Sequence, residues 1–185
     1  MKLLTELRRH LNDSPAVRWR LHRKRDRWLR ATSALDVAED TCEAIAAYRS
    51  LPSEQPLGLK YLALYGLLQC MYVQQDALVA LFGCFKGLTT PGKQRPQFRW
   101  EDYPEWKIVR TIRHEVAGHP SETREPCAVH GIIRMELSLG EFRYLSSLFD
   151  GKLQSKAADT RQLMEAQHAA AARLLRVLIA AADTP

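Results

Sequence analysis

The spacing of apolar and polar residues along the chain predicts a series of helices. The first helix covers residues 1–12, where leucines recur at the three- and four-residue intervals of one helical face. A second helix starts at Ser14 and Pro15, which combine an N-cap oxygen with a proline at the first helical position. Its apolar residues follow a heptad stripe, interrupted at Lys24: Val17, Leu21, Trp28, Ala31, Leu35, Ala38, Cys42 and Ile45. We expect one helix of roughly 30 residues, with a weak point at Thr32 and Ser33, that ends before Pro52.

Further helices are predicted in the rest of the chain. Residues 59–85 are apolar on nearly all sides, as expected of a central helix buried among others. Pro104 begins a helix that buries Val109, Ile112 and Val116 and ends at Gly118 and Pro120. Residues rich in proline and glycine predict loops over 86–97 and 120–126. The alanine-rich segment from 159 to about 182 predicts a last helix.

Residues 129–147 break the helical pattern and favour a small β-hairpin, with a helix as the alternative. Ile132, Met135 and Leu137 fit a strand, and Ser138 to Gly140 fit a turn into a second strand. The predicted fold class is therefore mainly α, a helical bundle with a small β-hairpin-like insertion around 129–147. We expect a single domain over 1–185, made of a basic N-terminal helical segment, 1–30, and a core, 31–185.

Composition and charge narrow the functional classes. No apolar run approaches the roughly 20 residues of a membrane span, and the first residues lack the apolar stretch of a secretory signal, so we expect a cytoplasmic protein without membrane contact. The chain has 27 Lys and Arg against 21 Asp and Glu, and its net charge of +6 favours an acidic partner such as nucleic acid. The four cysteines form no CxxC pair and are expected to be reduced.

The segment 111–120 contains two histidines that invite comparison with a zinc site. Zinc-protease helices place two histidines four residues apart, on one face. His114 and His119 are five apart, which separates them by roughly 140° on a helix. A third ligand would have to come from Cys127 or His130, at no recognisable spacing. The pattern therefore favours neither a metal site nor any other cofactor.

Arg113 and His119 suit a different chemistry. Arg113 is four residues after Val109 and three before Val116, so it lies toward the buried stripe, where its charge needs a partner or an anion. A planar guanidinium binds phosphate, and an imidazole titrates near neutrality. Metal-free RNA cleavage needs this combination, since one group moves protons and the other stabilises charge on the phosphate. The alternative is an ordinary ion-pairing arginine and a histidine at a helix end.

The string Ile-Arg-His-(x4)-His-Pro, at the end of a helix, resembles the motif of the HEPN superfamily. In that motif an arginine and a polar residue precede a histidine by four to six intervening residues, and Arg113, His114 and His119 match it. The helix over 59–85 resembles the long helix that packs against the motif helix in these proteins. The similarity covers about 30–125 and a C-terminal helix, and the 129–147 insertion is not part of the minimal family bundle.

The resemblance implies a metal-independent endoribonuclease that acts in toxin–antitoxin, antiviral or RNA-processing systems. It implies that Arg113 and His119 are the catalytic pair and that His114 supports the site. It also implies a homodimer in which two motifs form one composite site, with an antitoxin or nucleotidyltransferase as a possible partner. Some members of the superfamily have lost catalysis. The alternative function is therefore a helical module that binds RNA, nucleotide or a protein partner.

Two further groups of residues have candidate roles. Nine Lys and Arg against two acidic residues lie between residues 8 and 30, and we expect Arg20, Arg23 and Arg27 to contact RNA phosphates, with Trp19 as a stacking platform. The alternative is a solvated helix face. Gln74, Gln75 and Asp76 interrupt the apolar helix; they either brace the bundle or line a cleft near Arg113, where Asp76 would pair with the guanidinium.

Overall fold

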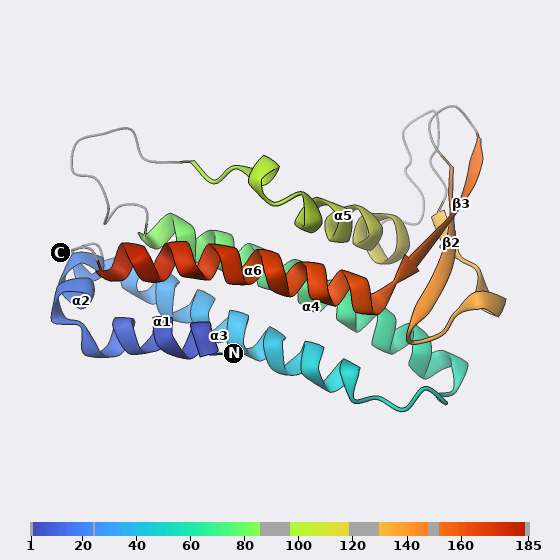
Figure 1. Ribbon diagram of the computed structural model, residues 1–185, viewed down its shortest axis with the longest axis horizontal. Coiled ribbons are helices and arrows are strands. Elements are labelled where there is room, and N and C mark those ends of the chain that lie inside the picture. Colours follow the sequence, from blue (N-terminus) through green and yellow to red (C-terminus); the bar gives the residue numbers. More distant parts are fainter. Residues whose placement is uncertain (1, 24, 86–96, 119–129, 148–151, 184–185) are drawn as a thin grey trace. The chain divides into compact units, whose positions relative to one another are not determined.

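A computed structural model describes residues 2–23, 25–85, 97–118, 130–147 and 152–183. These residues form mainly helices together with one small antiparallel sheet, which confirms the predicted fold class at that level (Figure 1). The predicted loops over 86–97 and 120–126 lie almost entirely outside the described residues. The helices are α1 (Lys2–Asp13), α2 (Pro15–His22), α3 (Arg25–Arg49), α4 (Leu57–Phe85), α5 (Pro104–Arg113) and α6 (Thr160–Asp183), with a π-helix, η2 (His114–Gly118), and two 3₁₀ turns, η1 (Trp100–Asp102) and η3 (Arg134–Glu136).

The first three helices follow the predicted apolar stripes, with one correction. In α1 the buried residues are Leu4, Leu7 and Leu11. The single helix predicted after Ser14 is instead two helices, because α2 ends at His22 and α3 begins at Arg25. The predicted weak point at Thr32 lies inside α3, where its hydroxyl donates to backbone carbonyls of the preceding turn. A heptad stripe cannot distinguish one continuous helix from two consecutive helices that keep the same face inward.

Helix α4 has the predicted extent but not the predicted burial on all sides. Leu59 and Leu62 expose 49% and 68% of their surface, and Tyr65 is also exposed. Farther along the helix, Leu67, Leu68 and Met71 are buried. The sequence pattern is equally apolar at both places. It therefore could not show that one face of the first turns is uncovered.

The predicted hairpin belongs to a three-stranded antiparallel sheet ordered β1-β2-β3 (Figure 1). Strands β1 (His130–Ile132) and β2 (Glu141–Ser147) form the hairpin, in which Ile132 pairs with Tyr144. Met135 was expected in a strand but lies exposed in η3. The third strand, β3 (Leu153–Asp159), was not predicted, because it lacks alternating apolar residues and buries only Ala158 fully.

Strand β3 passes directly into α6. It ends at Asp159, and the helix begins at Thr160, close to the predicted start. Thr160 fixes this junction to the turn before β2, since its hydroxyl donates to the carbonyls of Leu139 and Gly140 at 2.6 and 3.0 Å. The Asp159 carboxylate caps the new helix by accepting the backbone N–H of Gln162 at 3.0 Å.

The chain divides into two compact units. The first unit contains residues 1–43, 73–103 and 168–185, and the second contains 44–72 and 104–167, so α3, α4 and α6 contribute residues to both. The second unit holds α5, η2 and the sheet around a core that includes Met71, Val109 and Phe142. The predicted division of one domain at residue 30 stays a prediction. No helix within the described ranges is long and apolar enough to cross a membrane.

Candidate functional site

The helix that carries the predicted motif is built as its sequence suggests. Pro104 occupies the first helical position of α5, and the helix buries Trp106, Val109 and Ile112. Arg113 is its last residue, and the chain then continues as the π-helix η2. π-Helical turns are rare and occur frequently at functional sites. The motif therefore spans the point where regular α-helical winding ends.

Arg113 is half-buried, as expected from its position beside the apolar stripe. Its Nε and Nη2 donate to Oε1 of Gln69 at 3.1 and 3.0 Å. Its guanidinium also lies 4.7 Å from the centre of the Tyr72 ring. Both partners belong to α4 and neither carries a charge. In the described part of the chain, Arg113 is thus held in place by contacts that do not neutralise it.

A second guanidinium lies against the same aromatic ring. Arg110, one turn earlier in α5, is 4.1 Å from the centre of the Tyr72 ring. An aromatic face attracts cations, so one tyrosine holds two of them. Two guanidinium groups therefore lie against one ring, and guanidinium groups are the side chains best suited to bind a phosphate. This arrangement of Gln69, Tyr72, Arg110 and Arg113 is the candidate phosphate site.

The described residues do not show the other predicted site residues next to Arg113. His119 lies outside the described residues, so its catalytic role stays a prediction. His114 is the exposed first residue of η2. Asp76 is exposed rather than buried in α4, and it belongs to the first unit, whereas Arg113 belongs to the second. Its pairing with Arg113 stays a prediction.

Gln74 and Gln75 are buried, as the sequence pattern suggested. Gln74 donates its Nε2 to Sγ of Cys42 at 3.1 Å. Within the described residues, no group of three or more His, Cys, Asp or Glu side chains is placed to hold a metal ion. His119 and Cys127 lie outside that search.

A buried polar cluster joins the motif turn to the sheet, and the sequence analysis missed it. Glu115 of η2 is 8% exposed and accepts hydrogen bonds at Oε1 from Nζ of Lys156, at 2.8 Å, and from Oγ of Ser146, at 3.2 Å. Lys156 Nζ also donates to Ser146 Oγ at 3.3 Å, and Nδ1 of His130 lies 3.1 Å from the same oxygen. The four residues come from η2, β1, β2 and β3.

This cluster was missed because Lys156 belongs to the strand that was not predicted. The only signal was a lysine next to two alanines in a segment without helical spacing, and that is a weak signal. Once β3 pairs with β2, the register places Lys156 opposite Tyr144, beside Ser146. The cluster fixes the orientation of η2 two residues after Arg113.

The environment of Glu115 keeps it ionised. Burial by itself raises the pKa of the Glu115 carboxyl, but hydrogen bonds from Lys156, Tyr144 and Ser146, together with the Lys156 charge, bring the pKa below its ordinary value. The pKa of the Tyr144 hydroxyl is strongly raised, mainly by burial and further by the Glu115 carboxylate. At neutral pH the cluster therefore holds an ion pair and a protonated tyrosine.

The basic N-terminal segment presents one aromatic side chain to solvent. Trp19 is 62% exposed, and the guanidinium of Arg23 lies 4.8 Å above its ring. Arg27 is half-buried. Arg20 is engaged with the backbone instead, because Nε donates to Ala16 O and Nη2 to Ala182 O. Of the predicted RNA contacts, Trp19 and Arg23 are the most accessible.

Comparison with known proteins returned no matching family model, no matching curated protein and no matching solved structure. The case for a function therefore depends on the residues of this chain and on the geometry around them.

Proposed function

We propose that the chain is a metal-independent endoribonuclease of the HEPN type, with Arg113 and His119 as its catalytic residues. The proposal depends on the burial of the Arg113 guanidinium and on the groups that contact it. Its guanidinium is half-buried and held by Gln69 and Tyr72, two neutral groups. A fixed positive charge of this kind is what a phosphate that gains negative charge requires.

The two hydrogen bonds of Arg113 to Gln69 engage only part of the guanidinium, so other N–H donors can bind a phosphate. A guanidinium has five N–H donors, and the two bonds to Gln69 use one on Nε and one on Nη2. The Nη1 donors point away from that interaction and suit the oxygens of a phosphate. Because Gln69 and Tyr72 already restrict the side chain, binding a phosphate costs little additional rotamer entropy. Arg110 on the same ring adds a second positive charge.

The proposed reaction is an internal transesterification of RNA. The ribose 2′-oxygen forms a bond to the adjacent phosphorus, and the bond from phosphorus to the 5′-oxygen of the next nucleotide breaks. A base accepts the 2′-hydroxyl proton, and an acid gives a proton to the departing 5′-oxygen. His119 serves as one of these groups, and the second copy of the motif in a dimer supplies the other. Arg113 stabilises the additional negative charge on the phosphate oxygens.

Exposed apolar side chains in the second unit support the proposed homodimer. Leu59, Leu62 and Tyr65 are exposed at three-residue intervals on α4, the helix that carries Gln69 and Tyr72. Ile108 is exposed on α5, the helix that carries Arg113. Large exposed apolar side chains grouped along a helix are a feature of protein interfaces. We propose that two copies meet at this face, in the cytoplasm, with an antitoxin or nucleotidyltransferase as a possible further partner.

Activity assays on the purified full-length chain test the proposal. His119→Ala is expected to lower RNA cleavage by about 10²- to 10⁴-fold, the range for loss of a general acid or base. Arg113→Lys is expected to impair cleavage severely, because an ammonium cannot reproduce the planar fork. Arg143→Lys is the matched control, since this exposed arginine of the second unit pairs with Glu136 on the surface. It should leave cleavage unchanged.

The products and the metal dependence complete the test. Wild-type cleavage should persist in EDTA and leave a 2′,3′-cyclic phosphate and a 5′-hydroxyl. Activity that disappears with chelator and returns with zinc or magnesium would contradict the mechanism. If the wild type binds RNA but cleaves none, the alternative of a non-catalytic binding module replaces the ribonuclease.

A further inference from the structure

A pocket in the first unit has the form of a small-molecule site. Its volume is about 310 Å³, and side chains from α1, α3, α4 and α6 line it. All of its lining residues belong to the first unit, whereas Arg113 belongs to the second. Ligand pockets in proteins begin at about this size and combine an apolar wall with a few polar groups.

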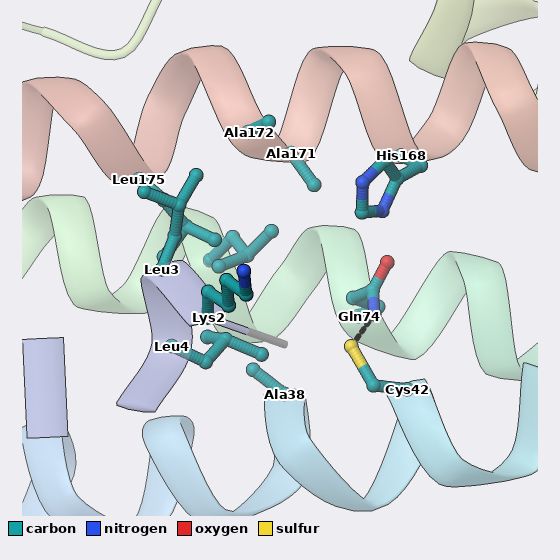
Figure 2. A pocket seen from close by; sticks show the side chains of 11 residues that line it. Lys2, Leu3, Leu4, Ala38, Cys42, Gln74, His168, Ala171, Ala172 and Leu175 are labelled. Atoms are coloured by element: carbon teal, nitrogen blue, oxygen red, sulfur yellow. Dashed lines mark hydrogen bonds between the residues drawn. The ribbon is translucent and has the colours of Figure 1, made fainter. Parts of the chain in front are cut away.

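The deep part of the pocket is aliphatic. Leu4, Ala38, Leu78 and Leu175 are buried lining residues, and Ala171 adjoins them on α6. Figure 2 shows the α1 leucines and Leu175 gathered at one end of the pocket. Among the lining residues that the structure describes, the His168 imidazole is the only aromatic ring, so they offer a nucleobase little surface for stacking. A flexible hydrocarbon chain fits this wall better.

The lining also contains polar groups: Figure 2 shows Lys2 beside the α1 leucines and Gln74 and His168 on the other side of the pocket. Lys2 and His168 are exposed at the surface, and Gln74 is buried and bonded to Cys42. Figure 2 shows Gln74 and His168 pointing toward one another from α4 and α6. None of the described lining residues is a carboxylate, and Lys2 carries a positive charge. The pocket therefore favours an anionic head group over a cationic one.

The cysteine in the pocket is not a nucleophile. Burial raises the pKa of the Cys42 thiol. The positive charge of the N-terminal amino group and the hydrogen bond from Gln74 lower this pKa only in part, and Glu43 and Glu39 raise it further. A thiol that stays protonated at neutral pH behaves as a small, weakly polar side chain. Binding in this pocket is accordingly non-covalent.

We propose that this pocket binds an aliphatic carboxylate, with its chain between the leucines and alanines and its carboxylate near Lys2. The proposal depends on a buried aliphatic wall next to an exposed ammonium, and none of the lining residues within the described ranges is a carboxylate. It does not depend on the ribonuclease proposal, because it uses none of the same residues.

Calorimetric titration of the full-length protein with hexanoate, octanoate and decanoate tests whether the hydrocarbon chain binds to the aliphatic wall of the pocket. Each added methylene is expected to tighten the dissociation constant by about fourfold until the pocket is full. Octanol, which has the same chain without the charge, should bind more weakly than octanoate. Equal binding of octanol and octanoate would overturn the anionic head group, and the absence of saturable octanoate binding would overturn the site.

Substitutions of lining residues test whether octanoate binds in this pocket. Lys2→Met should weaken octanoate binding by about two- to fivefold, as for an exposed charge pair, and leave octanol binding unchanged. Its control is Lys107→Met, an exposed lysine of the second unit. Ala172→Phe should fill the pocket and abolish binding, and Ala169→Phe, at an exposed position on the same helix, controls for the folding of α6. Octanoate binding that survives Ala172→Phe, with the protein folded, would place the ligand elsewhere and overturn the proposal.

Discussion

Glu115 is a buried acidic residue whose neighbours favour its charged form. Lys156 and Ser146 donate hydrogen bonds to its Oε1, and the pKa of the carboxyl is lower in the folded protein than in the unfolded chain. The unfolded chain therefore binds more protons between the two pKa values, so stability rises with pH in that interval. The contribution of Glu115 is complete above the unfolded value of about 4.5 and is lost as the pH falls through the folded value.

Replacement of Glu115 by Gln tests this dependence of stability on the protonation of Glu115. We expect the free energy of unfolding to fall by about 1–3 kcal/mol at pH 7, since Lys156 then lacks its charged partner. The difference from wild type should start to shrink as the pH falls below about 4.5 and disappear once the pH has passed the lowered pKa of the folded carboxyl, because the wild-type carboxyl is then neutral as well. Urea denaturation at several pH values provides the measurement.

Glu136→Gln is the control for this prediction, because Glu136 forms an exposed pair with Arg143. It should change stability by less than about 0.5 kcal/mol. A loss in Glu115→Gln that stays the same at every pH would show that shape, rather than charge, determines the effect.

The position of Arg113 could be predicted from the sequence, but its partners could not. A helical wheel over Val109 and Val116 places Arg113 beside the buried stripe, and the side chain is indeed half-buried. Gln69 and Tyr72 lie on another helix, more than forty residues earlier in the chain. Contacts between distant segments depend on how helices pack, and spacing within one helix contains no information about that.

At the scale of elements, α2 is a short helix that depends on its cap. It has eight residues, and the backbone N–H of Val17 donates to Oγ of Ser14 at 3.3 Å. Helices of this length are marginal without tertiary packing, and α2 buries only Val17 and Leu21. The cap therefore contributes an appreciable part of the local stability.

Ser14→Ala is expected to lower the free energy of unfolding by about 1 kcal/mol, the usual effect of losing a serine cap. Urea denaturation followed by circular dichroism measures the change. Ser53→Ala, at an exposed loop position, serves as the control and should be neutral. Equal stability of Ser14→Ala and wild type would mean that water replaces the cap without loss.

In the sheet, the sequence predicts the β1–β2 hairpin but not strand β3. The β1–β2 hairpin was predicted from apolar residues such as Ile132 and from a turn before residue 141. In the structure Phe142 and Tyr144 are buried and alternate with exposed residues in the first part of β2. Strand β3 is polar and small along most of its length, so no period of two marks it. Pairing with β2 holds it in place, and that pairing is invisible in the sequence of β3 itself.

At the scale of the whole molecule, the exposed leucines of α4 predict a dimer that charge can disrupt. Leu59→Asp combined with Leu62→Asp should convert the proposed homodimer to a monomer, because two charged groups per copy would be buried at the interface. Analytical ultracentrifugation at micromolar concentration measures the mass. The same variant should lose RNA cleavage if two motifs form one site.

Leu29→Asp is the control for the dimer, since Leu29 is similarly exposed on a helix of the first unit. It should leave the mass unchanged. A wild-type protein that is monomeric at the same concentration would contradict the homodimer.

The basic segment predicts RNA binding that depends strongly on salt. Replacing Arg20, Arg23 and Arg27 together by Ser should weaken binding to all RNA sequences. The slope of log affinity against log salt should become shallower by about 0.7 for each RNA phosphate that the variant no longer neutralises. Arg20→Ser also removes a hydrogen bond to the carbonyl of Ala182, so circular dichroism must confirm that the variant is folded. An unchanged slope would show that the segment is only a solvated face.

The direct passage of β3 into α6 restricts how the length of this chain can vary among related proteins. One residue inserted between Asp159 and Thr160 would turn every later side chain of α6 by about 100° around the helix axis. Leu163 and Leu174, now buried, would be displaced from the core. We expect relatives to keep this junction free of insertions and deletions, and to accept them between α3 and α4, where residues 50–56 form an exposed connection.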